Sequence, residues 1–398
     1  MQELNNITQS LLDSLNESFF ENIGDVCKQA LVDIKELLFE TLRKQIKKLD
    51  NEVRKSNKYL LVRSNQKRTI NLNVGKFTYR RNQYRNKSTN ETFCIDSLLG
   101  IKKYCRTPLS LRCYLADRYA NLGSYQKTAK SLENITFSHQ TIFNYLNSLN
   151  FNNMPECDNI DKSPRLCRHI FIEADEDHIN LYHDKRRYSN VYLIYFHEGY
   201  EKVSKGRYSL RLPMFFSGES PKQLWQNVST YILNHYPNLV SVSIHGDGAN
   251  WISKGCSYFK KIKNTFFLDK FHAKQASNRI AGKDSELRKQ ILDLLEQKDY
   301  FPLQMLFLEM KNQMEDIPSL VLDSQNYLLN NLPYISFDPE VKCSAEGHVS
   351  HILSSILSSR PKTWKIPNAF RVAKIRALLY SGTTLVDLYN LGYLRDPG

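Results

Sequence analysis

The chain has 398 residues, 41% of them hydrophobic and 24% charged, which is a globular composition too long for one ordinary core, so we expect two or three domains. Its 55 lysines and arginines against 41 acidic residues give a formal net charge of +14, which favours a polyanionic partner, either nucleic acid or an anionic membrane surface. Membrane-spanning and secreted proteins are excluded, because no apolar run approaches the roughly 20 residues that cross a bilayer and the first segment lacks the pattern of a signal peptide.

The amino-terminal region predicts basic helices followed by a basic β-hairpin. Apolar residues recur at helical spacing from 7 to 53, which indicates one or two amphipathic helices with a cationic outer face. Alternating residues from 59 to 95 indicate a hairpin around Gly75 that carries Arg80 and Arg81. A solvated basic face would explain either segment alone, and their presence in one chain makes DNA contact an equally good interpretation.

Residues 110–149 have the pattern of a helix-turn-helix. A leading helix is followed by a second one that Ser124 caps, a short break, and a third helix that Ser138 caps. The last helix of such a motif enters the major groove, and its polar early residues are therefore candidates for DNA contact: Ser138, His139, Gln140, Thr141 and Asn144. A plain pair of packed helices would give the same pattern. The polar, proline-containing residues 150–164 predict a linker.

The centre of the chain changes to β-strands. Apolar runs predict strands at 167–175, 178–183, 190–195 and 209–216, a helix at 220–236, and two more strands at 239–244 and 264–268. Antiparallel strands, a helix and then parallel strands are the order of an RNase H-like α/β fold. Residues 273–332 are helical by pattern and resemble an inserted helical domain, and a late helix follows at 349–358.

Acidic residues fall at positions of this fold that suit metal-dependent phosphodiester chemistry. Two Mg²⁺ ions about 3.5 to 4 Å apart can activate the attacking oxygen and stabilise the leaving one, and they need hard oxygen ligands. Asp175 interrupts the first apolar run, with Asp177 as the alternative. Asp247 follows a buried strand between two glycines, and Glu346 precedes the late helix. A turn aspartate and a glutamate at a helix start would be the structural explanations of the last two.

Four strings of residues carry a family resemblance. IEADEDH, SIHGDGANWI, FFLDKFHAKQ and CSAEGHVSHILSSILSSRPKTW resemble those of the ISLre-type bacterial insertion-sequence transposases, which are related to mutator-type transposases. The likeness covers most of the chain, including the basic hairpin. It implies that Asp175, Asp247 and Glu346 are the catalytic, metal-binding acids, with an all-helical insertion before the glutamate. It also places His272 where mutator-like enzymes have a histidine after the second aspartate, whereas residues 385–398 depart from the family pattern.

Other residues flank the predicted acids. Lys254, Arg360 and Lys362 are candidates for phosphate contact, and Trp364 for stacking on an unpaired base, unless they lie in solvated loops. The eight cysteines form no close pair, so no disulfide framework is indicated and a reducing cytoplasm fits. A zinc site would require distant residues to converge, namely Cys256, His272, Cys343 and His348.

These observations predict a bacterial DNA transposase that hydrolyses element ends with two Mg²⁺ or Mn²⁺ ions and transfers strands into target DNA. Its expected partners are terminal inverted repeats, target DNA and further copies of itself in a synaptic complex, with no membrane, in a nucleoid-associated cytoplasmic location. The alternatives are another RNase H-like nuclease and a non-catalytic helix-turn-helix protein or decayed transposase. The predicted parts are basic helices (1–58), a basic hairpin region (59–109), the helix-turn-helix (110–150), an RNase H-like core (165–272 and 336–380), a helical insertion (273–335) and a tail (381–398).

Overall fold

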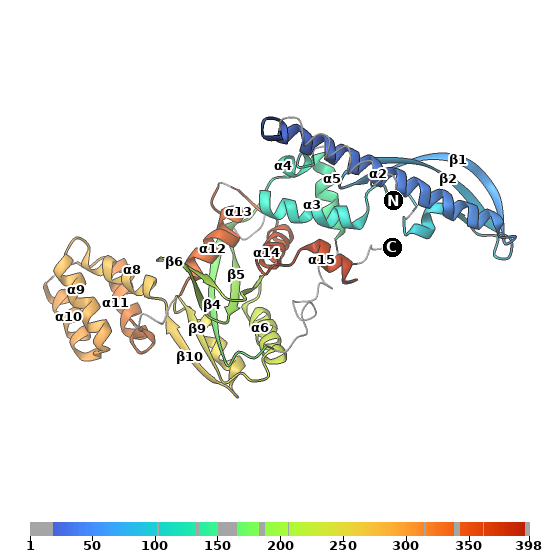
Figure 1. The fold of residues 1–398 in the computed structure, drawn as a ribbon. Helices are drawn as coiled ribbons and strands as arrows, with labels where there is room; N and C mark the ends of the chain where they lie inside the picture. Colours follow the sequence, from blue (N-terminus) through green and yellow to red (C-terminus); the bar gives the residue numbers. More distant parts are fainter. Residues whose placement is uncertain are drawn as a thin grey trace. The chain divides into compact units, whose positions relative to one another are not determined.

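The computed structural model forms two compact units, which are Met1–Leu115 with Tyr125–Leu146, and Ala116–Ser124 with Asn147–Gly398. It describes residues 19–101, 103–132, 135–149, 165–182, 188–205, 207–313, 316–337, 343–360 and 362–394 (Figure 1). The predicted linker at 150–164 lies outside these residues. Within them, no helix is both long and apolar enough to cross a membrane.

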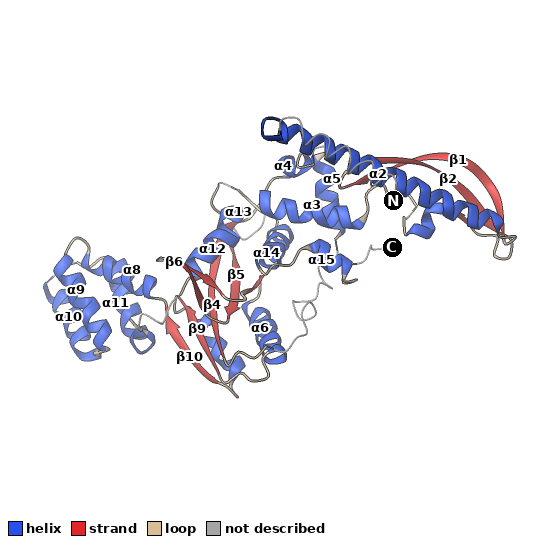
Figure 2. Ribbon diagram, in the orientation of Figure 1, coloured by secondary structure: helices blue, strands red, loops and turns tan. Residues whose placement is uncertain are grey.

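The first unit contains one long helix and a three-stranded sheet. Helix α2 (Phe19–Lys55) is continuous where the sequence predicted one or two helices, and strands β1 (Tyr59–Leu72) and β2 (Gly75–Asn86) form the predicted antiparallel hairpin, extended by β3 (Thr92–Cys94) (Figure 2). The pairing of Leu72 with Gly75 puts the turn at residues 73–74, just before the predicted position. Buried rings that include Phe39 of the helix and Phe77 of the hairpin hold these elements together.

The predicted helix-turn-helix segment folds into α3 (Leu109–Leu122), α4 (Tyr125–Ala129) and α5 (His139–Ser148). The predicted cap of the last helix is confirmed, because Ser138 Oγ accepts a hydrogen bond from Thr141 N at 3.1 Å. Helix α4 is shorter than the predicted 125–132. The segment is therefore three short helices, of which α5 buries Ile142 and Leu146.

The second unit is built on a five-stranded mixed sheet in the order β10-β9-β4-β5-β8. Strands β4 (His169–Asn180), β5 (Tyr188–His197) and β8 (Met214–Gly218) are antiparallel neighbours, whereas β9 (Ser241–Gly246) and β10 (Lys263–Leu268) run parallel to β4. Helix α6 (Pro221–His235) joins the two sets. The predicted order of antiparallel strands, helix and parallel strands is thus confirmed.

Two of the predicted strand limits are wrong. The runs at 167–175 and 178–183 belong to the single strand β4, and the run at 209–216 contributes to two strands, β7 (Arg207–Leu210) and β8. Strand β7 pairs with β6 (Tyr200–Ser204) in a separate hairpin. The acids at 175–177 seemed to interrupt a strand, but Glu176 and Asp177 accept hydrogen bonds from Trp251 and Ser358, and the backbone of β4 continues through all three.

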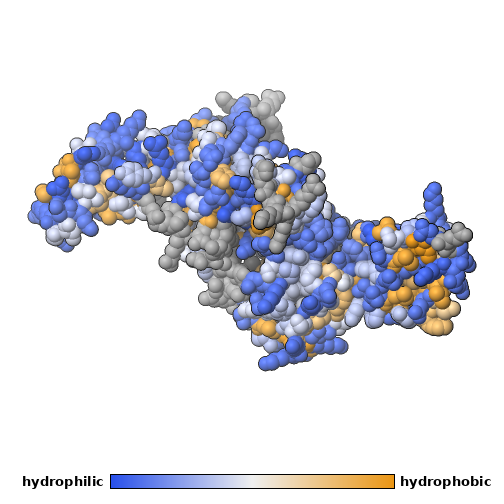
Figure 3. All heavy atoms as spheres, turned by 180° about the vertical axis from the view of Figure 1, so that it is seen from behind, coloured by the Kyte–Doolittle hydropathy of each residue, from blue (hydrophilic) through white to orange (hydrophobic). Residues whose placement is uncertain are grey.

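Helices follow β10. The helical segment comprises α8 (Lys270–Ala281), α9 (Ser285–Gln297), α10 (Tyr300–Gln313), α11 (Ser319–Asn331) and the 3-10 turn η3 (Leu332–Tyr334), which pack around their own apolar core. Helix α10 also exposes Phe301, Met305 and Leu308, and Figure 3 shows apolar surface over this segment. Two short helical segments, α7 (Asn250–Ser253) and η2 (Lys254–Phe259), lie between β9 and β10. After the helical segment, the chain forms α12 (Ala345–Val349), a π-helical turn η4 (Ser350–Ser354), α13 (Ser355–Leu357), α14 (Ile366–Tyr380) and α15 (Leu385–Asn390).

The buried Arg376 of α14 supplies hydrogen-bond donors to the backbone of the π-helical turn. Its guanidinium donates hydrogen bonds to the carbonyl oxygens of Ile352 and His351, the latter at 2.6 Å, and to that of Ala120 at 3.0 Å. A π-turn disturbs the regular helical hydrogen bonds, so its carbonyls need other donors. Arg376 therefore fixes the helix that follows Glu346.

The carboxyl group of Asp117 should make the stability of this unit depend on pH. Asp117 is buried and accepts hydrogen bonds from Leu385 N at 3.2 and 3.1 Å, and burial raises its pKa to about 7 despite them. The folded state then holds a proton that the unfolded chain releases above its ordinary pKa of 3.8, so stability increases as the pH falls from 8 towards 5, by roughly 2 kcal/mol.

Asp117→Asn should reduce this dependence by the contribution of Asp117, as measured by urea unfolding at pH 8 and pH 5, while the contribution of Asp175 remains. The exposed Asp293→Asn is the control and should leave the dependence unchanged. An unaltered pH profile in Asp117→Asn would contradict the prediction.

Candidate active site

Strand β4 presents acids on one face of the sheet. Side chains alternate along a strand, so Glu173, Asp175 and Asp177 point to the same side, and each is at most 8% exposed. They differ in their partners. Asp177 accepts a hydrogen bond from Ser358 Oγ at 2.8 Å, whereas Asp175 Oδ1 accepts one from Glu176 N at 2.8 Å. The acids of β4 therefore lie in different environments.

Asp175 converges with His272 and Glu346. One ligand atom from each of the three side chains lies within 4.8 Å of the others, and this is the one such His, Cys, Asp or Glu group within the described ranges. Asp175 comes from β4 and is buried, His272 comes from α8 and is half-buried, and Glu346 comes from α12 and is exposed. Carboxylate oxygens and an imidazole nitrogen suit a divalent cation, and the exposure of Glu346 leaves one side of the group open to solvent.

Repulsion between acids marks this group as a cation site. Burial and, to a smaller extent, the charges of Asp247 and Glu346 together raise the pKa of Asp175 to about 7, against the hydrogen bond from Glu176 N. A carboxyl group that resists ionisation beside other carboxylates is stabilised in its charged form by a metal ion. The donor set therefore fits one or more divalent cations.

Asp247 lies near the group of Asp175, His272 and Glu346 but does not belong to it. It follows β9, the parallel neighbour of β4, and its Oδ1 accepts a hydrogen bond from Ala249 N at 2.8 Å. Its carbonyl oxygen accepts a hydrogen bond from Tyr327 OH at 2.5 Å, and it lines a cavity of about 380 Å³ together with His272 and Arg279. Asp247 thus adds charge near Asp175 from a loop that the helical segment contacts.

The glycines around Asp247 serve packing within the chain. A Cβ on Gly246 would come within 2.9 Å of the carbonyl oxygen of Ala174 and closer still to Ile252, and Gly248 has φ +90. Gly246 thus allows the backbone of the neighbouring strand β4 to approach closely, and Gly248 adopts a positive φ that side chains rarely tolerate. Both glycines are therefore required to place Asp247.

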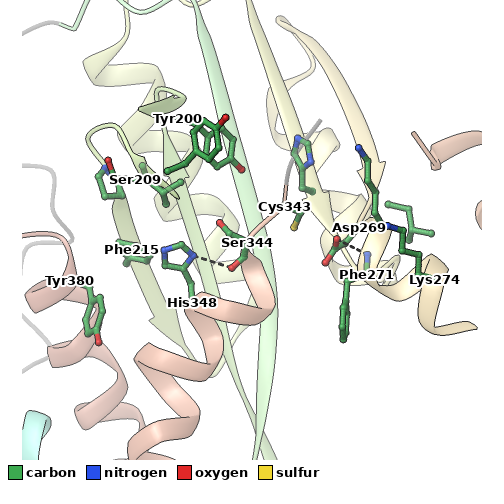
Figure 4. Close-up of a pocket in the computed structure, with 16 residues that line it drawn as sticks. Tyr200, Ser209, Phe215, Asp269, Phe271, Lys274, Cys343, Ser344, His348 and Tyr380 are labelled. Carbon is green, nitrogen blue, oxygen red and sulfur yellow. Dashed lines mark hydrogen bonds between the residues drawn. The ribbon is translucent and has the colours of Figure 1, made fainter. Parts of the chain in front are cut away.

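Glu173 is a functional candidate that sequence reasoning passed over. This fully buried carboxylate accepts hydrogen bonds from Tyr195 OH at 2.6 Å, Tyr200 OH at 2.8 Å and Ser344 N at 2.5 Å, and lies 2.9 Å from His197 Nε2. Burial alone would raise its pKa, but His197 and the other donors outweigh burial and hold it at about 2. Ser344 and its partner His348 are visible in Figure 4.

Glu173 links the two segments that supply the triad acids. It lies two residues before Asp175 on the same face of β4, and it binds Ser344, which lies two residues before Glu346. In the sequence, Glu173 could have been found from its position two residues before Asp175 in one strand, because this spacing places both acids on the same face. We conclude that this carboxylate fixes the start of α12 against β4.

Two of the predicted DNA contacts after Glu346 are wrong. Trp364 is 7% exposed and donates its Nε1–H to Leu357 O at 2.8 Å, so its ring faces are packed and cannot stack on a base. Lys362 Nζ donates to the carbonyl oxygens of Gly123 and Ile356, at 3.3 and 3.1 Å, rather than facing a phosphate. Arg360 and Lys254 are exposed, as phosphate contacts require.

The suggested zinc site does not form among the described residues. His272 belongs to the acidic group, and His348 lies 3.0 Å from Tyr195 OH through its Nδ1. Cys256 and Cys343 are free cysteines that enter no group with ligand spacing in the parts of the chain that are placed. The residues lie on separate elements, and the fold does not bring them together.

The predicted DNA-contact residues of α5 lie on its outer side. Ser138, His139, Gln140 and Asn144 are exposed and Thr141 is half-buried, opposite the buried Ile142 and Leu146. Gln140 Nε2 donates to Asn144 Oδ1 at 2.9 Å. This face is polar and accessible on its own unit.

The hairpin arginines have different surroundings. Arg80 is exposed, but the prediction for Arg81 is wrong, because its Nη1 binds the fully buried Asp96 at 2.8 Å together with Arg68. Beside this ion pair lies a cationic groove of about 810 Å³, whose lining includes Lys67, Lys76, Arg106, Tyr104 and Phe137. Asp96 pairs with both inner arginines, Arg68 and Arg81, while Lys67, Lys76 and Arg106 are exposed cations.

The fold and site define a mixed α/β protein with an acidic, histidine-containing group on its central sheet. The chain belongs to the uncharacterised protein family UPF0236, whose model matches residues 12–388. One UPF0236 protein of Caldanaerobacter subterraneus subsp. tengcongensis is 27% identical over 407 residues, covering 98% of this chain and 86% of the relative. Another from the same organism is 28% identical over 364 residues, covering 89% and 75%.

Among solved structures, the Drosophila P element transposase strand transfer complex is similar at a TM-score of 0.29 with 11% sequence identity. The match covers 72% of this chain and 84% of the other. A TM-score this low does not define a common fold.

Proposed function

We propose that the chain is a metal-dependent DNA transposase of the ISLre type, with Asp175, Asp247 and Glu346 as its acidic triad. The observation that carries the proposal is the meeting of Asp175, His272 and Glu346 beside Asp247, from segments far apart in the sequence. Two carboxylates and an imidazole around one point, with a third carboxylate nearby, suit divalent cations and phosphodiester chemistry. The basic charge of the chain supplies a reason for DNA as substrate.

The strand order supports an RNase H-like core. Numbered along the sheet by their order in the chain, the five strands run 5-4-1-2-3, with the first, second and third antiparallel and the fourth and fifth parallel to the first. The first acid lies on the first strand, the second acid follows the fourth, and the third lies on a helix after an all-helical segment. This is the arrangement that the resemblance to insertion-sequence transposases implies.

The chain's own residues have distinct roles in the proposed reaction. Asp175, Asp247 and Glu346 would hold two Mg²⁺ or Mn²⁺ ions, which supply activation of the attacking oxygen and stabilisation of the leaving oxygen. His272 lies within reach of both Asp175 and Glu346 and would orient a carboxylate or contact the scissile phosphate. Glu173 and Arg376 fix the helix that carries Glu346.

Strand cleavage and joining test the proposal directly. The purified protein, incubated with Mg²⁺ and DNA that carries the terminal inverted repeats flanking its coding sequence, is expected to nick the repeat ends and join their 3′-hydroxyls to target DNA. Chelation by EDTA should stop both steps. Cleavage without joined products would indicate a nuclease instead, and absence of metal binding by calorimetry would indicate a non-catalytic DNA-binding protein.

The cationic groove of the first unit should contribute to DNA affinity. Lys67→Gln combined with Arg106→Gln removes two exposed charges, so affinity for duplex DNA should fall across all sequences and the slope of log K against log salt should decrease by about 2. Fluorescence anisotropy at several salt concentrations measures both. The control replaces another exposed pair, Arg288→Gln with Lys289→Gln. Equal losses in the two double variants would show that the groove has no special role.

A further inference from the structure

A second, larger cavity lies next to the acidic site. It has a volume of about 850 Å³ and is lined from the β6–β7 hairpin, β8, the start of α8 and the start of α12. Figure 4 shows Phe215 and Tyr380 on one side and Phe271 and Lys274 on the other, with Ser344 between them. Aromatic rings and lysines thus meet in one hollow of the second unit.

The lining combines flat rings with cations. Its rings come from Tyr200, Tyr208, Phe215, Phe271 and Tyr380, and its cations are Lys270 and Lys274. Phe271 is 50% exposed and Tyr208 49% exposed, so part of each ring is available for stacking. A ligand that matches this lining has a planar ring system and negative charge, which are the two features of a nucleotide.

His245 gives an independent indication of a ligand. It lines the same cavity and is 2% exposed, yet its Nε2 has no hydrogen-bond partner among the described residues. Buried polar atoms are nearly always paired, so an unpaired nitrogen in a cavity wall indicates a missing partner inside the cavity. A base edge offers both donors and acceptors. Metal chemistry is a poorer match, because no described group there has ligand spacing.

The position of the cavity connects it to the proposed reaction. Lys270 and Phe271 immediately precede His272, and Ser344 and His348 lie two residues on either side of Glu346. A nucleotide bound in this cavity and the scissile phosphate at the acids would therefore be close neighbours on one strand of the DNA substrate. A free nucleotide would have no need of this proximity.

We propose that this cavity receives a single unpaired nucleotide of the DNA substrate, whose base stacks on Phe271 and Tyr208 and whose phosphate faces Lys274. The inference rests on the proposed function and adds a subsite to it. An extruded base leaves the duplex stack at some cost, and stacking on protein rings with a hydrogen bond to His245 offsets it. Such a subsite would position the strand next to the acids.

The test compares two DNA probes in EDTA, where no cleavage occurs. One is a fully paired 25-base-pair duplex, and the other is the same duplex with one unpaired 2-aminopurine nucleotide. Wild-type protein is expected to bind the second about five- to tenfold more tightly, with a change in 2-aminopurine fluorescence as the base stacks. Phe271→Ala should abolish both effects, while Phe301→Ala, which removes an exposed phenylalanine from α10, should retain them.

Each outcome decides between explanations. Equal affinity of wild-type protein for the two probes, or an undiminished preference in Phe271→Ala, would overturn the inference and leave the proposed function intact. Failure to bind either probe would instead contradict the proposed function. Deoxyadenosine monophosphate is added as a separate arm, and its binding to wild-type protein but not to Phe271→Ala, without a preference for the unpaired probe, would assign the cavity to a free nucleotide and overturn the DNA assignment.

Discussion

Asp175→Asn is expected to abolish metal-dependent strand cleavage, by a factor on the order of 10³ or more, while making the metal-free protein more stable at pH 8. Asparagine keeps the shape of the side chain but not its charge, so the cation loses its buried ligand. The same change removes a carboxyl group whose pKa burial and neighbouring acids raise to about 7. Above that pH the folded wild-type chain holds an unfavourable charge that the variant lacks.

Opposite effects on activity and stability make this prediction specific. Cleavage of end-containing DNA measures the first, and thermal unfolding with and without Mn²⁺ measures the second. Mn²⁺ should raise the melting temperature of the wild type but not of the variant, because only the wild type has the complete site. Retained cleavage, or a less stable metal-free variant, would contradict the role assigned to Asp175.

Asp177→Asn is the matched control, since Asp177 lies on the same strand and face. Its carboxylate accepts a hydrogen bond from Ser358 Oγ and stands outside the group of Asp175, His272 and Glu346. Cleavage should therefore continue in this variant. Loss of cleavage in Asp177→Asn with retention in Asp175→Asn would reverse the choice between the two acids that the sequence left open.

Glu173→Gln is expected to lower the free energy of unfolding by about 1 to 3 kcal/mol, the range found when a buried hydrogen-bonding group is left without its partner. The carboxylate accepts hydrogen bonds on both oxygens, from Tyr200 at Oε1 and from Tyr195 and Ser344 N at Oε2, and His197 lies at Oε1. A glutamine must turn its NH₂ group towards one of these sets. Either orientation therefore places a donor against donors.

The position of Glu173 predicts a catalytic consequence in addition to the loss of stability. Freed from β4, Ser344 would no longer fix the start of α12, and Glu346 would lose its placement beside Asp175. At a temperature where the variant remains folded, its affinity for Mn²⁺ should fall, which calorimetry measures. Glu201→Gln, a change at an exposed position of β6, is the control for both readouts. Unchanged stability and metal affinity in Glu173→Gln would contradict a linking role.

The strands and their order could be predicted from the sequence because they depend on local apolar patterns. Apolar runs such as the predicted strand at 239–244 cluster strongly, and turn residues separate them. The acids at 175–177 broke that pattern, and the sequence therefore predicted two strands where β4 is continuous. Two of these acids bind residues far away in the sequence, Glu176 with Trp251 and Asp177 with Ser358, which no local pattern reports.

The same physical reason explains the errors among the predicted DNA contacts. Arg81 and Lys362 were chosen for charge, and Trp364 for its ring, without knowledge of Asp96, Ile356 or Leu357 as their partners. A cation or an aromatic ring is available to DNA only when the fold leaves it unpaired, and that depends on distant segments. The group of His272, Asp175 and Glu346, by contrast, joins residues that the family resemblance had singled out, although the resemblance implied Asp247 as the third acid.

Residues 273–345 connect His272 on α8 with Glu346 on α12, and Tyr327 within them contacts the main chain of Asp247. If this segment were a disordered loop, bringing its two ends together would cost about 4 kcal/mol in conformational entropy. Folded into helices around its own core, it has already lost that entropy before any cation arrives. The affinity of the site for a cation should accordingly depend on the stability of this helical core, although the core contains none of the residues that would bind the cation.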